Sequence, residues 1–243
     1  MVAVALRNVV KQYKMGQARI HALAQIDLSV RRSRFTVLAG RSGSGKTTLL
    51  NLMGGIDRPD SGKIFIANQD LSTLSDNELT DFRARNIGFI FQNFNLIPVL
   101  TAYENVEYPL IIRQAPRARR RAQVLSALDS VGLADKAAHM PGQLSGGQRQ
   151  RVAIARALIH QPQIVLADEP TANLDSVTGQ AILELLRKLQ LERGLSVIFS
   201  SHDPQVIAAA DEVHIVSDGL VNAAIANAGA SPQGGSMERL QGV

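Results

Sequence analysis

Cysteine and tryptophan are absent from this chain of 243 residues, and aromatic residues make up only 4% of it. Without cysteine there are no disulfides or thiolate metal sites, so a reducing compartment is compatible with the composition. Long apolar runs are also missing. The longest interior stretch without charge, 86–103, contains Gln92, Asn93 and Pro98, which a bilayer core would reject. The apolar part of the N-terminus is too short for a signal peptide. The sequence predicts a cytoplasmic protein.

The net charge is modest, at +5 from 26 basic and 21 acidic residues. Such an excess is compatible with nucleic acid, an acidic partner or a membrane surface and selects none of them. The length allows one large α/β domain with a sizeable core.

Short β-rich runs alternate with helical patterns, which predicts an α/β fold with a mostly parallel sheet. Strands are expected at 2–10, 26–31, 35–40, 62–69, 86–92, 163–168, 195–201 and 212–218, and helices at 46–55, 76–84, 102–113, 117–131, 146–160 and 176–191. The first two strands indicate an N-terminal antiparallel piece, in which 2–10 is expected at a sheet edge. The run of helices between 102 and 160 predicts a helical insertion in the α/β core.

A phosphate-binding loop is predicted at 40–48, where GRSGSGKTT fits the pattern G-x-x-x-x-G-K-[ST] between an expected strand and an expected helix. Its glycines let backbone N–H groups turn inward around an anion. Lys46 can reach the β- and γ-phosphates, and the Thr47 hydroxyl suits Mg²⁺. The expected nucleotide contacts are Gly40, Arg41, Ser42, Gly43, Ser44, Gly45, Lys46, Thr47 and Thr48.

Two carboxylates follow the apolar strand 164–167. Asp168 lies at the carboxyl end of this strand, where open α/β sheets bind ligands, and Glu169 comes next. Adjacent carboxylates at a strand end cannot point the same way, so two roles are expected. Asp168 would face Mg²⁺, and Glu169 would act as the general base toward the attacking water.

A second glycine-rich turn, LSGGQ, occupies 144–148 and opens a basic helical segment. Paired glycines let N–H groups converge at the positive end of the helix that follows. The start of this helix can therefore bind an anion, but nothing in the neighbouring sequence holds a phosphate for it.

The phosphate loop, LSGGQ, LADEP at 166–170 and SSHD at 200–203 together resemble the ATP-binding subunit of ATP-binding-cassette (ABC) transporters. The resemblance covers about residues 2–220, with the motifs in the family's order. It implies a P-loop ATPase core with a helical signature subdomain, MgATP as the bound nucleotide, and ATP hydrolysis coupled to transport. The domain would span 1–221, with a core at 1–93 and 161–221 and the helical subdomain at 94–160. Residues 222–243 would be a flexible tail.

The resemblance implies further site residues. Tyr13 matches the aromatic residue that stacks on adenine, although a strand-end tyrosine is the alternative. Gln92 matches the glutamine that contacts Mg²⁺ and the attacking water, and His202 matches the histidine that contacts the γ-phosphate. Asp175 closes the segment 173–175 that passes between two subunits. The signature loop is matched by Ser145, Gly146, Gly147 and Gln148.

Two partners are also implied. In this family the signature loop caps the γ-phosphate held by the other subunit, so a second copy of the chain is expected. An integral membrane permease is expected to dock near 92–110, which would place the chain on the inner face of the cell membrane. The apolar surface there would comprise Phe94, Leu96, Ile97, Leu100 and Tyr103, unless these side chains belong to the core of the helical subdomain.

Three stretches most resemble the lipoprotein-release and macrolide-export group of cassettes. They are 91–110, EPTANLD at 169–175, and the extra residues between Tyr13 and Ala22. One departure lies at 31–35, RRSRF, where the family usually has a Gly-Glu turn. Ser33 and Arg34 must turn there without the freedom of glycine.

Other readings compete with the transporter ATPase. RQAPRARRRAQ at 113–123 invites a nucleic-acid interpretation, but its arginines spread over more than one helix face and no aromatics are interleaved, which favours a solvated or partner-facing helix. A soluble cassette ATPase that acts on nucleic acid or the ribosome usually carries two cassettes in one chain or a long coiled-coil insertion. This sequence shows neither. An ATP-closed switch without turnover would not need Glu169. Arg149 and Arg151 either steer phosphate or line the helix surface.

Overall fold

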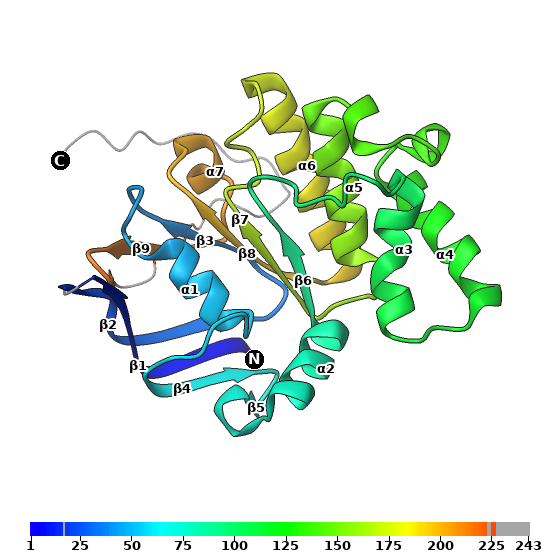
Figure 1. Ribbon diagram of the computed structural model, residues 1–243. Helices are drawn as coiled ribbons and strands as arrows, with labels where there is room; N and C mark the ends of the chain where they lie inside the picture. The colour runs from blue at the N-terminus through cyan, green and yellow to red at the C-terminus, as the bar shows by residue number, and fades with distance from the viewer. Residues whose placement is uncertain (17, 223–224, 227–243) are drawn as a thin grey trace.

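A computed structural model describes residues 1–16, 18–222 and 225–226 (Figure 1). The strands are β1 (Val2–Met15), β2 (Ala18–Arg31), β3 (Phe35–Ala39), β4 (Ser61–Ile66), β5 (Gln69–Asp70), β6 (Ile87–Ile90), β7 (Ile164–Asp168), β8 (Ser196–Ser201), β9 (Glu212–Ser217), β10 (Leu220–Val221) and β11 (Ile225–Ala226). The α-helices are α1 (Lys46–Met53), α2 (Asp76–Asn86), α3 (Ala102–Ile112), α4 (Arg117–Ser130), α5 (Gly146–Leu158), α6 (Ser176–Arg193) and α7 (Pro204–Ala208).

Every expected helix and strand is present, and the α/β class is confirmed. The strand expected at 62–69 ends at Ile66, because Ala67 and Asn68 turn with positive φ. The sequence patterns did not indicate α7 or the short strands β5, β10 and β11, which are too brief to show a period.

The antiparallel piece is a sheet of order β2-β1-β4-β5. The expectation that 2–10 forms an edge strand was wrong, because β1 pairs with β2 on one side and with β4 on the other. Val4, for example, lies opposite both Val30 and Ile66. Alternation of apolar and polar residues shows which face of a strand is buried, but it is the same for edge and central strands.

The main sheet has the order β10-β9-β3-β8-β7-β6, in which β9 to β6 run parallel, as expected. The central strands β3, β7 and β8 are buried on both faces. In β8, Val197 and Phe199 join one hydrophobic core while Ile198 joins the other. Such continuous burial is typical of parallel sheets covered on both sides.

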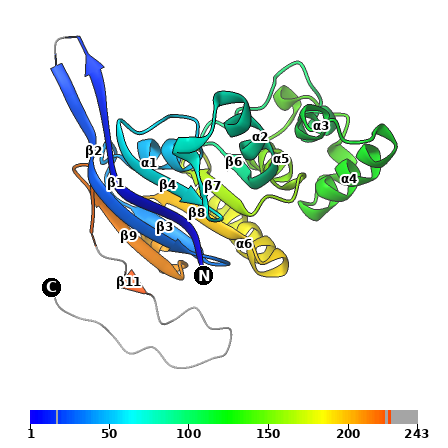
Figure 2. The ribbon, with the colours of Figure 1, turned by 90° about the horizontal axis from the view of Figure 1, so that it is seen from below.

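The two faces of the main sheet carry different layers (Figure 2). On one face, α1 and the antiparallel sheet share a core that includes Leu49, Leu52 and Ile64. On the other face, α5 and α6 pack with α3 and α4 around Val106 and Val152. The helical insertion and the phosphate-loop helix therefore lie on opposite sides of one sheet.

The turn before β3 forms without glycine, as the sequence requires. Ser33 adopts a left-handed conformation, with φ of 54°. Its hydroxyl donates a hydrogen bond to the carbonyl of Gly194 at 2.8 Å, and its N–H donates to Ser196 Oγ at 3.0 Å. These bonds offset the backbone strain of a side chain in this conformation.

Among the described residues, no helix is long and apolar enough to cross a bilayer. Of the predicted tail, Ile225 and Ala226 pair with β9, and nearly all the rest lies outside the described residues.

Candidate nucleotide site

The phosphate loop connects β3 to α1 at the carboxyl edge of the main sheet. Gly43 and Gly45 have φ of 79° and 107°, values that side chains other than glycine rarely adopt. A Cβ at Gly40 would lie 2.2 Å from the carbonyl oxygen of Val216, and one at Gly45 would lie 2.8 Å from that of Ala22. The loop therefore needs its glycines both for its curvature and for close backbone contacts.

The N-terminus of α1 is suited to an anion. Ser75, Thr101, Ser145 and Asp175 cap α2, α3, α5 and α6, whereas α1 begins at Gly45 without a side-chain cap. Uncapped N–H groups at a helix start attract negative charge. The loop opens into a cavity of about 530 Å³ lined by Ile20, His21, Ala22, Ser42, Gly43, Gly45, Lys46, Thr47, Thr48, Gln92, Glu169, Asp218 and Gly219.

Lys46 supplies the positive charge of this cavity and is only 4% exposed. Its Nζ donates hydrogen bonds to the carbonyls of Gly40 at 2.8 Å and Arg41 at 2.9 Å. It also lies 3.5 Å from Glu169 Oε1. A buried ammonium held only by carbonyls and one carboxylate can take phosphate oxygens as stronger partners.

Asp168 and Thr47 meet where the metal is expected. Thr47 Oγ1 donates to Asp168 Oδ1 at 3.2 Å, and Ser200 Oγ donates to the same oxygen at 2.6 Å. The Thr47 hydroxyl at the start of α1 and the Asp168 carboxylate at the end of β7 form a donor set that suits Mg²⁺, which favours few protein oxygens together with substrate phosphates.

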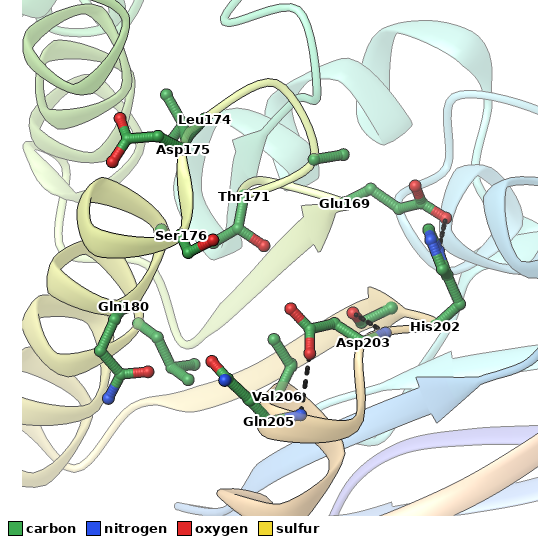
Figure 3. A pocket seen from close by; sticks show the side chains of 14 residues that line it. Glu169, Thr171, Leu174, Asp175, Ser176, Gln180, His202, Asp203, Gln205 and Val206 are labelled. Carbon is green, nitrogen blue, oxygen red and sulfur yellow. Dashed lines mark hydrogen bonds and ion pairs between the residues drawn. The ribbon is translucent and has the colours of Figure 1, made fainter.

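Glu169 and His202 form a pair beside this group (Figure 3). His202 Nδ1 lies 3.4 Å from Glu169 Oε1, and the histidine side chain is 64% exposed. Glu169 has φ of 41°, an unusual value for a residue with a side chain, and its N–H donates to Ser200 Oγ at 3.0 Å. Strained backbone is common at functional sites, because the surroundings must hold it in place.

Glu169 lines two cavities. One is the phosphate-loop cavity, which Gln92 also lines. The other, of about 310 Å³, is lined by His202 and Asp175 and is shown in Figure 3. Asn173 lies in sequence between Ala172 and Leu174 of the second cavity, and its Nδ2 donates to the carbonyl of Gln92 at 3.1 Å.

Tyr13 is anchored beside the site but does not line the phosphate-loop cavity. Its hydroxyl donates to Asp57 Oδ2 at 2.7 Å, and Lys11 Nζ lies 5.1 Å from the centre of its ring. Partial burial, together with the hydrogen bond to Asp57, raises the pKa of the tyrosine hydroxyl. The ring is 40% exposed, so an adenine contact stays a prediction.

The signature loop lies away from the phosphate loop. Ser145 Oγ accepts a hydrogen bond from the N–H of Gln148, whose side chain accepts one from the N–H of Ser145. A Cβ at Gly147 would lie 2.5 Å from Thr178 Cγ2, so glycine allows α5 to start against α6. Among the described residues no hydrogen bond or ion pair joins the signature loop to the phosphate loop, and Figure 1 shows β6 and β7 between α1 and α5.

Some functional candidates were missed by the sequence analysis. Ser200 orients both Asp168 and the backbone of Glu169, and only its place at the end of a buried strand signals this. Arg156 donates to the carbonyls of Phe94 and Asn95, and burial lowers its pKa to about 10. The sequence left two roles open for Arg149 and Arg151. Arg151 donates to the carbonyl of Val131, and Arg149 lies over the ring of Phe94, so both side chains contact the helical region.

A separate apolar groove of about 340 Å³ lies between α2, β6, α3 and α5. It is lined by Ile56, Arg83, Ala84, Ile87, Phe89, Phe91, Asn95, Pro109, Ile112, Arg156, Ala157 and His160. The segment 92–110 thus contributes Asn95 and Pro109, whereas Leu96 and Tyr103 pack against the core.

The fold and the phosphate-loop geometry define a P-loop nucleoside triphosphatase. Residues 23–172 match the model of the ABC transporter family. The chain is 47% identical over 222 residues to an uncharacterized ABC transporter ATP-binding protein, MJ0796, from Methanocaldococcus jannaschii, covering 90% of this chain and 94% of that protein. The chain therefore belongs to the ABC transporter family, as an ATP-binding ATPase subunit.

Other similar proteins are named transporter components. A macrolide export ATP-binding/permease protein, MacB, from Rhodopirellula baltica is 46% identical over 90% of this chain, which covers 32% of that protein. A lipoprotein-releasing system ATP-binding protein, LolD, from Syntrophotalea carbinolica is 40% identical over 90% of this chain and 96% of its own length. A dimeric, post-hydrolysis structure of MJ0796 bound to ADP and Pi superposes with a TM-score of 0.85 at 46% identity, covering 92% of this chain and 98% of that one.

Proposed function

We propose that two copies of this chain close around two MgATP molecules and power a separate membrane permease of the export type. The observation that carries the proposal concerns two helix N-termini that are suited to binding anions. Those of α1 and α5 lie on opposite faces of one sheet. One chain cannot bring both to the same phosphate, but two opposed chains can. The dimeric MJ0796 structure supports the same arrangement.

In this proposal the phosphate loop and Lys46 hold the β- and γ-phosphates, and Thr47, Asp168 and Gln92 face Mg²⁺. The metal would neutralise developing charge and orient the phosphates. Glu169 takes a proton from the attacking water, and His202 contacts the γ-phosphate and orients Glu169.

The second chain completes each site through Ser145 and the residues beside it. Because Ser145 Oγ accepts the capping bond from Gln148, its own proton is free to be donated to a γ-phosphate oxygen. Asp175, at the start of α6, lies at the rim of the cavity that Glu169 and His202 share. Loss of the γ-phosphate removes the charge that both chains bind, so hydrolysis would release the dimer.

The concentration dependence of the rate tests this proposal. If each site needs two chains, MgATP hydrolysis should rise more steeply than linearly with protein concentration until the dimer saturates. A rate strictly proportional to concentration, with no association detected by light scattering, would contradict the shared site.

The domain boundaries and position belong to the same proposal. The ATPase domain would span 1–221, with the helical subdomain at 94–160 inserted in the core. The chain would act on the inner face of the cell membrane, bound there by its permease. A nucleic-acid role has less support, because the relatives are transporter components and the arginine-rich segment 113–123 contains no aromatic residue.

Ser200→Ala is expected to lower the rate of MgATP hydrolysis about 10- to 100-fold and to raise the Mg²⁺ concentration needed for half-maximal activity. The change removes the 2.6 Å bond that orients Asp168 and leaves the N–H of Glu169 without its acceptor. Mg²⁺ titrations of the ATPase rate measure both effects. Thr36→Ala is the matched control, because Thr36 is a buried hydroxyl in the same sheet without a hydrogen-bond partner. Equal losses in both variants would refute a specific role for Ser200.

Ile56→Glu is expected to reduce co-purification with the membrane subunit at least about tenfold, and to leave the ATPase rate of the isolated chain unchanged. Ile56 is 47% exposed at the apolar groove, which suits an amphipathic helix of a permease. A carboxylate there would lose solvent on docking without a partner. Leu191→Glu, at a 62% exposed position on α6, is the control. Normal co-purification of the Ile56 variant would show that the groove is not the docking site.

A further inference from the structure

The connection between α3 and α4 lies at the periphery of the fold (Figure 1), and the residues of this corner are basic and mostly exposed. Residues 113–121 contain five arginines and no acidic residue. Two of the five are engaged, since Arg113 donates to the carbonyl of His160 and Arg120 lies 3.6 Å from Glu107. The other three, Arg117, Arg119 and Arg121, are exposed, and no ion pair to them is found among the described residues.

The local backbone adds positive potential to this corner. The helix α4 begins after Pro116 with no side-chain cap and no acidic residue in its first turn. The other long helices of the helical region, α3 and α5, both start with a capping box. The uncapped N–H groups at the start of α4 carry partial positive charge and are repelled by the arginines beside them. This repulsion disfavours the isolated helix. An external negative charge would relieve that repulsion.

Apolar side chains flank the arginines. Tyr108, Ile111 and Ile112 at the end of α3 are 44%, 46% and 53% exposed. Ile112 also lines the apolar groove, so the corner continues directly from that groove. We define the basic corner as Tyr108, Ile111, Ile112, Arg117, Arg119 and Arg121.

We propose that the basic corner binds the anionic headgroups of a lipid bilayer. Arg117 and Arg121 are four residues apart and share one face of α4, so both can contact the phosphates of a planar bilayer at once, while Arg119 lies on another face and adds to the positive potential of the corner. Isoleucine and tyrosine beside arginine suit the headgroup boundary, where apolar and polar parts of a side chain are both satisfied. The corner faces the bilayer if the groove holds the membrane subunit, so its orientation rests on the proposed function.

Vesicle co-sedimentation of the purified chain tests the proposal. Binding is expected to vesicles that contain phosphatidylglycerol, little binding to phosphatidylcholine alone, and release at roughly 0.5 M salt, where surface charges are screened. The double variant Arg117→Glu, Arg121→Glu should weaken binding at least about tenfold, since each basic residue near an anionic surface contributes about fivefold. A glutamate at 117 lies in the first turn of α4, where it favours the helix, and position 121 is exposed, so loss of binding would not reflect unfolding.

The matched control reverses two charges on the hairpin of β1 and β2, which lies far from the corner (Figure 2). Lys14 and Arg19 are exposed cross-strand neighbours there, and Lys14→Glu, Arg19→Glu should leave vesicle binding within about twofold. Equal losses in both variants, or equal binding to neutral vesicles, would overturn the proposal. So would a corner variant that keeps vesicle binding but no longer co-purifies with the membrane subunit in detergent, because the corner would then be a protein contact. The proposed steps of ATP hydrolysis use no residue of the basic corner, so failure here would leave the proposed function intact.

Discussion

Glu169→Gln is expected to lower the rate of MgATP hydrolysis by about 10²- to 10⁴-fold while ATP binding is kept. The amide has nearly the shape of the carboxylate, so the contacts near Lys46 and His202 keep their geometry, but it cannot accept a proton from water. Because the γ-phosphate is then not removed, the proposed dimer should persist. Single-turnover hydrolysis and gel filtration with MgATP measure the two effects.

The size of the variant in solution is the sharper readout. Without nucleotide it should elute as a monomer, and with MgATP as a stable dimer. Glu192→Gln removes an exposed carboxylate on α6 and serves as the control, with an unchanged rate. A Glu169→Gln chain that stays monomeric in saturating MgATP would contradict the shared site, and one that still hydrolyses ATP at the normal rate would exclude Glu169 as the base.

The parts of the fold with strong periods or fixed spacing could be predicted from the sequence. The phosphate loop is an example. Gly43 and Gly45 adopt positive φ, a conformation that favours glycine, and the spacing of these glycines can be read directly from the sequence. The carboxyl end of β7 could also be located, since four apolar residues precede Asp168. Residues close together in the sequence determine these features, so they can be recognised in a single sequence.

Features that depend on neighbours far along the chain could not be predicted. The central position of β1 depends on its pairing with β4, about 60 residues later. The orienting role of Ser200 depends on β8 lying beside β7, and a serine in a strand has no period that reveals it. Permease docking near 92–110 stays a prediction, and the apolar groove beside this segment is also lined by residues from α2, β6 and α5, which no pattern in the sequence brings together.

The same reasoning explains why one chain shows two kinds of helix start. Ser145 caps α5 with its own hydroxyl and Gln148, whereas α1 relies on backbone N–H groups and the buried Lys46. An uncapped start can bind an anion deep inside its own loop. A capped start can offer the remaining hydroxyl proton to an anion held elsewhere. The sequence difference between the two loops therefore suits the two different positions around the γ-phosphate that we propose for them.

Lys46→Ala is expected to weaken ATP binding about 10²-fold or more, because it removes the buried cation that we propose to contact the phosphates. The released carbonyls of Gly40 and Arg41 border a cavity of about 530 Å³, so water can hydrate them and the fold should survive. Isothermal titration with MgATP measures the affinity, and thermal unfolding without nucleotide checks the fold.

Lys188→Ala removes an exposed lysine of α6 and should bind ATP normally, which separates the effect of position from that of net charge. Since nucleotide is proposed to join the two chains, the Lys46→Ala chain should also fail to dimerise in MgATP, unlike the Glu169→Gln chain. Unchanged affinity would refute the phosphate-loop assignment. A Lys46→Ala chain that loses ATP but still dimerises would show that the two chains associate through protein surfaces alone, so the nucleotide would not hold them together.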